Sequence, residues 1–415
     1  MIATLIAIAA LCLHVAGVFA AMHAVMHTRT AQGAFAWVLG LVLLPYVTLV
    51  PYLFLGASHF GGYVDLHRQR QARFFMLHEE AAHPARPGVL PQAAPIRDTR
   101  YDAIGKMLNT SMHGGNALFL HVDGEAAFAA MFAAIARAER YVLLQFFIIH
   151  DDVLGRRLSE ALLERAAAGV EVCVLYDSIG SHALPDSYVE RLRAGGVHVH
   201  RFATRRWRNR FQLNFRNHRK VLVVDGVRGF VGGLNAGDEY LGAKPPLSPW
   251  RDTHMEIEGP AVADLQRVFA EDWYWVTGER PPSSPPPERC GRAASLIVAT
   301  GPADRQESCS LFFTQAIHAA RKRVWITTPY FVPDQAVFGA LRLAVFRGVD
   351  VRILIPCRPD HRTVFMASTL YAHEATLAGV RMFRYQPGFV HQKVMLIDDD
   401  TAVVGSMNMD NRSFR

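Results

Sequence analysis

Histidine, lysine and aspartate recur in the pattern H-x-K-x4-D at two places in this sequence. The six residues are His218, Lys220 and Asp225 in the first copy and His391, Lys393 and Asp398 in the second. The four residues between lysine and aspartate are apolar in both copies, which is typical of a buried β-strand. Since residues two apart on a strand share a face, each histidine and its lysine are expected to point at one ligand. A solvated strand face would explain a single copy, but the repetition indicates a paired functional unit.

These side chains suit the cleavage of a phosphodiester. One imidazole can attack phosphorus while the other donates a proton to the leaving alkoxide, because the ordinary pKa of histidine is about 6.5. The two lysines can neutralise the phosphoryl oxygens as point charges. This division of roles requires two motifs, and it requires neither a metal ion nor a cofactor.

Small residues and asparagines follow both copies at one distance. After each aspartate come six residues, then Gly-Gly or Gly-Ser, then one further residue and an asparagine. The residues of interest are Gly233, Asn235, Ser406 and Asn408. We expect the asparagines to donate hydrogen bonds to the phosphate and the small residues to support the site. Asp225 and Asp398 lie an odd number of positions beyond the histidines, so within the motif we expect them to be structural anchors rather than proton carriers.

The similarity between the halves extends upstream of the motifs. Residues 133–148 resemble 316–331, and residues 169–177 resemble 348–356. Each half reads as helices alternating with buried strands rich in β-branched and aromatic residues, which is typical of an α/β fold. We therefore expect two α/β repeats that pack around one shared active site.

Composition indicates the domain boundaries. The stretch PPSSPPP at 281–287 cannot continue a helix or enter a central strand, so it marks a linker. The expected parts are a membrane hairpin over 1–57, a juxtamembrane segment over 58–115, a first repeat over 116–280, a linker over 281–295 and a second repeat over 296–415. The five cysteines have no CxxC spacing, which argues against a zinc site or a disulfide framework.

Two apolar stretches precede the repeats. Ile2–Met26 and Phe35–Gly56 are each long enough to cross a hydrocarbon core of about 30 Å. A cleaved signal peptide is the alternative for the first stretch, although its apolar run is long and has no basic flank before it. The basic HRQRQAR at 67–73 follows the second stretch, and basic flanks stay on the cytoplasmic side. We expect two transmembrane helices and a cytoplasmic catalytic part.

The net charge of +7 is partly concentrated in RRWRNR at 205–210. A basic loop that contains a tryptophan can dock on anionic lipid headgroups. It can equally be a solvated loop, and a basic patch also suits nucleic acid. The charge alone therefore does not discriminate between substrates.

The paired motifs, each followed by x6-G-[GS]-x-N, resemble the phospholipase D superfamily. The apolar N-terminal region, the segment WRDTHMEIEGPAVADLQRVFAEDW at 250–273 and GSMNMDNRSFR at 405–415 are similar to the bacterial cardiolipin synthases of that superfamily. The resemblance implies two phospholipase D-like repeats and a multi-pass protein of the bacterial inner membrane. It also implies phosphatidylglycerol as donor and acceptor, an anionic membrane surface as partner, and neither a nucleic acid nor an obligatory protein partner.

The resemblance implies roles for the two histidines. His218 attacks the phosphorus of one phosphatidylglycerol, and protonated His391 gives its proton to the departing glycerol. His391 then deprotonates the hydroxyl of a second phosphatidylglycerol, which takes the phosphatidyl group and becomes cardiolipin.

Asp252 lies where the family has an acidic residue that orients the catalytic imidazole. In the second half the family's corresponding Glu follows the RSF stretch, whereas this chain ends at Arg415. We therefore expect a shortened second repeat without its final strand and helix, and we expect His391 to lack an orienting carboxylate.

Two other functions fit the same residues. With water as acceptor, the site would make a membrane-anchored phospholipase D or nuclease, because only a pocket that excludes water favours transfer. A non-catalytic scaffold for anionic lipid or nucleic acid would retain the fold, although two complete motifs argue against it. The choice of nucleophile, the acceptor headgroup and the oligomeric state stay open at this point.

Overall fold

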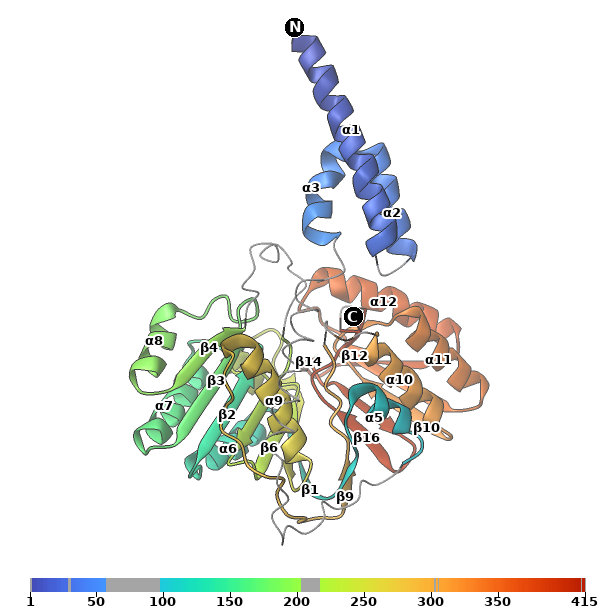
Figure 1. The fold of residues 1–415 in the computed structure, drawn as a ribbon. Coiled ribbons are helices and arrows are strands. Elements are labelled where there is room, and N and C mark those ends of the chain that lie inside the picture. The colour runs from blue at the N-terminus through green and yellow to red at the C-terminus, as the bar shows by residue number, and fades with distance from the viewer. Residues whose placement is uncertain are drawn as a thin grey trace. The chain divides into compact units, whose positions relative to one another are not determined.

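The computed structural model describes residues 2–28, 31–56, 98–202, 217–301, 304, 306–411 and 413–414. The chain divides into two compact units, one of residues 1–73 with 203–216 and one of residues 74–202 with 217–415 (Figure 1). The basic stretch at 205–210 and the basic flank at 67–73 lie outside the described residues.

The N-terminal unit contains one helix that is long and apolar enough to cross a membrane, counted over the described residues. This is α1 (Ile2–His27); α2 (Ala31–Leu43) and α3 (Pro45–Leu55) are shorter. The predicted continuous second span over 35–56 is therefore divided in two. The break falls at Leu44, with φ −134° and ψ 54°, because the proline that follows disfavours helical geometry in the residue before it.

Helix α3 turns back alongside α1 instead of extending α2. Tyr46 lies within hydrogen-bonding distance of His14, and the Tyr52 hydroxyl lies 2.7 Å from Nδ1 of His23. The later residue of α3 contacts the later residue of α1, so α3 runs in the same direction as α1. The threonine Thr48 secures the turn by donating from Oγ1 to the Leu44 carbonyl. The end of α3 thus lies beside the end of α1.

The first α/β repeat is built on an eight-stranded sheet with the order β4-β3-β2-β5-β6-β8-β1-β9. Its strands are β1 (His113–Val122), β2 (Tyr141–Phe146), β3 (Glu171–Asp177), β4 (His198–Phe202), β5 (Val221–Val224), β6 (Arg228–Gly232), β8 (Thr253–Glu258) and β9 (Ala293–Ser295). The pairs β2-β3 and β3-β4 are parallel, and the others are antiparallel. The edge strand β9 lies within the predicted linker.

Helices cover both faces of this sheet (Figure 1). They are α6 (Asp123–Ala136), α7 (Val153–Ala167) and α8 (Asp186–Ala194) on one face and α9 (Val262–Thr277) on the other. Strands β2 and β5 are buried along their whole length, as strands covered on both faces are. Asp152 caps α7 by accepting a hydrogen bond from the Gly155 backbone at 2.9 Å.

The second repeat has a five-stranded sheet with the order β13-β12-β10-β15-β16, which matches β4-β3-β2-β5-β6 of the first. Its strands are β10 (Arg323–Thr327), β12 (Asp350–Pro356), β13 (Arg381–Tyr385), β15 (Val394–Ile397) and β16 (Thr401–Val404). Its helices are α10 (Ser308–Ala319), α11 (Gln335–Phe346) and α12 (Arg362–Leu377), and α5 (Asp102–Leu108), from the predicted juxtamembrane segment, packs on α10. The expected α/β fold with two repeats is confirmed.

Two short strand pairs complete the fold. Strand β7 (Trp250–Arg251), from the first repeat, pairs in parallel with β14 (Phe389–Val390), from the second. Strand β11 (Phe331–Val332) pairs in parallel with β17 (Met409–Asp410). The β7-β14 pair ties the two repeats together directly before Asp252 and His391.

Candidate active site

The histidine–lysine pairs lie immediately before β5 and β15 and not within those strands as the alternation predicted. The backbone at these positions bonds outside the two sheets' ladders: the N–H of Asn217, next to His218, donates to the Asp177 carboxylate, and the N–H of His391 donates to the Arg251 carbonyl at 2.8 Å. The pairs still converge as expected. Lys220 Nζ lies 3.3 Å from both ring nitrogens of His218, and Lys393 Nζ lies 2.8 Å from Nδ1 of His391.

Each histidine is held by the opposite repeat. Nδ1 of His391 lies 2.7 Å from Oδ2 of Asp252, which belongs to the first repeat. Nδ1 of His218 lies 3.0 Å from the backbone carbonyl of Ser406, which belongs to the second. The β7-β14 register explains the contact between Asp252 and His391. Trp250 is paired with Phe389, and Asp252 and His391 each lie two residues further along the chain. The two motifs thus share one site.

The expectation that His391 lacks an orienting carboxylate was wrong. Asp252 supplies that carboxylate across the repeats, a contact that no spacing within one repeat can indicate. Asp252 is fully buried, and although burial favours its neutral form, the charge of Lys393 and the hydrogen bond with His391 lower the pKa of its carboxyl. The carboxylate therefore faces His391 in its charged form.

Gly233 makes room for this carboxylate. A Cβ atom at position 233 would lie 2.1 Å from Oδ1 of Asp252, well inside contact distance. In the second copy Ser406 takes the corresponding place, and its backbone carbonyl, not its hydroxyl, contacts His218. The Gly-Gly and Gly-Ser pairs therefore act on different histidines by different means.

Both contacts fix the position of a proton. A carbonyl and a carboxylate only accept hydrogen bonds, so Nδ1 of each histidine is the donor in these two contacts. The lysines, which also only donate, bond instead to the backbone carbonyls of His218 and His391. In the neutral imidazole the proton on Nδ1 leaves a lone pair on Nε2. His218 accordingly presents a nucleophilic Nε2, and His391 presents an Nε2 that can accept a proton or, once charged, give it away.

Burial and neighbouring cations favour neutral imidazoles. Burial and the charges of both lysines hold the pKa of His218 well below its ordinary value. Burial and Lys393 lower the pKa of His391 to about 4, although Asp252 acts in the opposite direction. Both rings are thus neutral at neutral pH.

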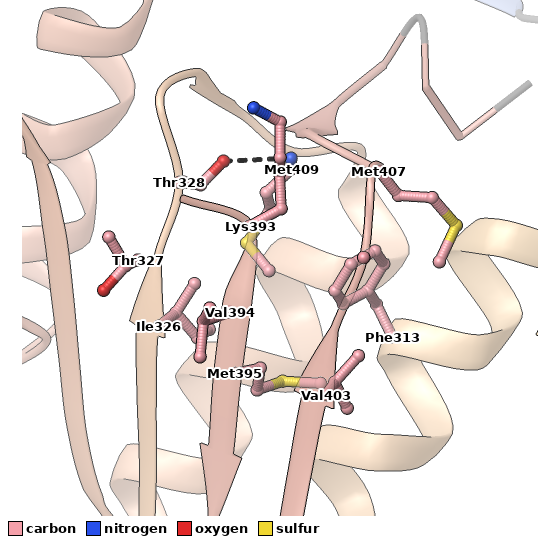
Figure 2. A pocket seen from close by; sticks show the side chains of 11 residues that line it. Phe313, Ile326, Thr327, Thr328, Lys393, Val394, Met395, Val403, Met407 and Met409 are labelled. Carbon is pink, nitrogen blue, oxygen red and sulfur yellow. Dashed lines mark hydrogen bonds between the residues drawn. The ribbon is translucent and has the colours of Figure 1, made fainter. Parts of the chain in front are cut away.

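The two lysines are themselves buried. Burial lowers the pKa of Lys220 well below its ordinary value, and it lowers the pKa of Lys393 to about 8, with Asp252 opposing both shifts. Lys393 lies at one end of an apolar pocket (Figure 2). Its apolar lining includes Phe313, Ile326, Met395, Val403, Met407 and Met409. A phosphate oxygen would therefore meet a poorly hydrated cation, which strengthens the attraction.

The two asparagines differ. Asn235 uses both ends of its amide within the protein, since Oδ1 accepts from the Ile148 backbone at 3.1 Å and Nδ2 donates to the Tyr240 hydroxyl at 2.9 Å. Oδ1 of Asn408 is buried and has no hydrogen-bond partner among the described residues. Binding of phosphate by these amides remains a prediction, and for Asn235 it would have to use the second Nδ2 hydrogen.

Asp225 and Asp398 lie at the far ends of β5 and β15 in left-handed backbone conformations, with φ 52° and 51°. Asp225 accepts hydrogen bonds from three successive backbone N–H groups, those of residues 139–141, at 2.8–2.9 Å. Asp398 does the same for residues 321–323 at distances from 2.7 to 3.2 Å. This geometry is that of an anchor for the start of β2 or β10.

Sequence reasoning missed the side chains that surround the histidines. The Trp250 ring lies 5.1 Å from the His391 ring, and the Phe147 ring lies 4.7 Å from the His218 ring. Asp272 on α9 accepts hydrogen bonds from Asn217 and Arg219, the two neighbours of His218, at 2.7 and 2.6 Å. Trp250 and Asp272 both lie in the segment at 250–273, but nothing local in that segment indicates what they contact.

The described residues contain no group of three or more His, Cys, Asp or Glu side chains that could hold a metal ion. The chemistry that the site offers is that of imidazole, ammonium, amide and one carboxylate. Such a set can bind a phosphoryl group, attack it and exchange a proton with a leaving or entering oxygen.

Comparisons with known proteins agree with this geometry. A family model described as "Cardiolipin synthase, PLD-like domain" matches residues 131–273 and 313–415, and one described as "Phospholipase_D-nuclease N-terminal" matches residues 15–56. The crystal structure of phosphatidylserine synthase from Haemophilus influenzae Rd KW20 is similar in fold, with a TM-score of 0.53 at 17% identity over 77% of this chain and 84% of that chain.

Curated relatives are much closer in sequence. Cardiolipin synthase A of Pseudomonas aeruginosa (strain LESB58) is 59% identical over 408 residues, 97% of this chain and 83% of the relative. Cardiolipin synthase A of Pseudomonas entomophila (strain L48) is 57% identical over 411 residues, 97% of this chain and 85% of the relative. The chain belongs to the cardiolipin synthase family, whose catalytic domain is phospholipase D-like.

Proposed function

We propose that this cardiolipin synthase, a phosphatidyltransferase, moves a phosphatidyl group from one phosphatidylglycerol to another through a phosphohistidine on His218. The observation that carries the proposal is that each histidine is held by the opposite repeat, one by a carboxylate and one by a carbonyl. Unequal partners suit unequal roles.

In the first half-reaction Nε2 of His218 attacks the phosphorus, and glycerol departs with a proton from His391. The negative charge of the bound phosphodiester offsets the lysine charges that lower the pKa of His391, so the ring gains its proton when substrate binds. Asp252 then stabilises the charged ring. Lys220 and Lys393 stabilise the charge that builds up on the non-bridging oxygens.

In the second half-reaction the roles of His391 reverse. Its neutral ring removes a proton from the terminal hydroxyl of a second phosphatidylglycerol, whose oxygen attacks the phosphohistidine and releases His218. One phosphodiester replaces another, so the exchange needs no nucleotide. Water as acceptor would instead give phosphatidic acid.

The direct test is lipid mass spectrometry on the purified protein supplied with phosphatidylglycerol alone. Cardiolipin and glycerol in equal amounts are expected. Phosphatidic acid as the main product would show a hydrolase, and no turnover of any phosphodiester would support a binding scaffold.

We also propose that the catalytic part lies on the cytoplasmic side of a bacterial inner membrane. The basic flank at 67–73 supports this side. Because α3 returns beside α1, we propose that α1 alone crosses the membrane and that α2 and α3 enter the membrane from the cytoplasmic side and return to it. External labelling should then modify a cysteine at position 4 and spare one at position 33. The reverse pattern would restore the two-helix hairpin.

A further inference from the structure

Helix α12 presents three of its large apolar side chains to solvent. Its buried residues are small: Ser368, Ala372 and Ala375. Met366, Leu370 and Leu377 are 72%, 59% and 76% exposed. Their spacing of four and seven residues brings all three onto one helix face, here named the α12 stripe. A surface helix ordinarily buries such residues, so α12 has the reverse of the usual pattern.

The fold does not impose this reversal. Helix α8 is the counterpart in the first repeat, since it connects β3 to β4 as α12 connects β12 to β13. Its large apolar residues are buried: Tyr188, Val189 and Leu192. Its exposed side chains include Glu190 and Arg193. The stripe is therefore a property of the second repeat's sequence.

The surroundings of the α12 stripe are charged, with both signs present. Arg358 and Arg362 are exposed at the N-terminal end of the helix with the half-buried Asp360 between them, and His373 is exposed on the stripe itself. Glu374 is the exposed acidic residue of the helix, at the edge of the stripe. An apolar stripe flanked by charged side chains is the composition of a helix that lies in a lipid interface.

Helix α12 also contacts a strand pair that leads to the candidate site. Ser368 accepts a hydrogen bond from the Phe331 backbone at 3.0 Å. Phe331 belongs to β11, which pairs with β17, and β17 begins directly after Asn408. The position of α12 is thus coupled through one strand pair to the loop that carries Asn408.

We propose that the α12 stripe inserts into the interface of a phospholipid bilayer and holds the active site at the membrane surface. Lipid is favoured over protein as the occupant, because the family's substrates are phospholipids and the same chain carries the apolar helix α1. The inference goes beyond the proposed reaction and does not depend on which histidine is the nucleophile.

Fluorescence quenching tests the inference independently of activity. The full chain, with Cys12, Cys290 and Cys357 replaced by serine, receives a bimane probe on Leu370→Cys or, as the matched control, on Phe346→Cys. Phe346 is 76% exposed and lies on α11. In vesicles that contain phosphatidylglycerol, lipids with brominated acyl chains should quench the probe at position 370, and aqueous iodide should quench the probe at 346.

Other patterns would overturn the inference. A probe at position 370 that iodide quenches as readily as the one at 346 would show a solvated stripe. A probe that neither quencher reaches would show that protein, such as a second copy, covers the stripe. Equal quenching of both probes by the lipids with brominated acyl chains would show that insertion is not specific to α12.

Kinetics give a second readout. The triple variant Met366→Ser, Leu370→Ser, Leu377→Ser should raise the apparent KM for vesicle phospholipid by about tenfold and leave kcat on a short-chain monomeric phospholipid unchanged. The matched control Leu343→Ser, Phe346→Ser on α11 should change neither. A triple variant with the parent KM on vesicles would contradict the inference.

Discussion

At the scale of residues, the two imidazoles differ in their hydrogen-bond partners. Both histidines donate from Nδ1, but only His391 donates to a carboxylate. A carboxylate stabilises an imidazolium, whereas a carbonyl orients a neutral ring with little effect on its charge. His391 is therefore suited to hold and release a proton, and His218 is suited to attack.

Asp252→Asn should remove the charge that favours protonated His391. The pKa of His391 then falls further below its present value of about 4, so the limb of the pH profile that requires the acid form should move to lower pH. At neutral pH, kcat should fall by roughly 10²-fold, the lower end of what acid–base catalysis contributes. A pH profile of kcat/KM checks this. An unchanged limb would mean that Asp252 does not act through His391.

Gly233→Ala should displace the same carboxylate by steric contact. An added Cβ would lie 2.1 Å from Oδ1 of Asp252, and a shift of this size costs about 10²-fold in rate. Gly405→Ala is the control, because nothing lies within 4 Å of a Cβ at that position. Equal activity of the two variants would refute the role assigned to Gly233.

At the scale of elements, the repeated motif predicted the strands and helices of both halves, because periodicity and β-branched runs are local signals. It did not predict that β7 pairs with β14 or that Asp252 serves the histidine of the other repeat. The apolar pattern at the N-terminus likewise did not predict the turn at Leu44, where a proline divides an otherwise apolar stretch. Contacts between repeats depend on packing, and no spacing within one repeat encodes them.

Asp225→Asn and Asp398→Asn test the anchors at this scale. Each exchange replaces one acceptor oxygen by a donor that faces backbone N–H groups, which should cost about 1–3 kcal/mol of unfolding free energy. The melting temperature should fall while kcat per folded molecule is largely retained. Loss of kcat without loss of stability would instead indicate a catalytic carboxylate.

At the scale of the whole molecule, the buried neutral histidines should make the fold sensitive to acid. Burial lowers the pKa of His254 to about 3 and that of His391 to about 4, whereas both titrate at about 6.5 when unfolded. Their contribution is complete above pH ~6.5 and is lost as the pH falls toward 4 and then 3, at about 1.4 kcal/mol per pH unit for each ring.

Thermal unfolding between pH 8 and pH 4 measures this slope. His254→Gln, which cannot gain a proton, should flatten the decline in melting temperature relative to the parent chain. A decline equally steep in the variant would show that other groups cause the acid sensitivity.

Whether His218 carries the phosphatidyl group can be tested by trapping the intermediate. His391→Ala supplied with a phosphatidyl donor that has an activated leaving group needs no general acid for attack, yet lacks the base for transfer. Peptide mass spectrometry under alkaline conditions should therefore find the phosphatidyl group on the peptide that contains His218, and His218→Ala should yield no adduct. An adduct on His391 in His218→Ala, with none on His218 in His391→Ala, would contradict the account.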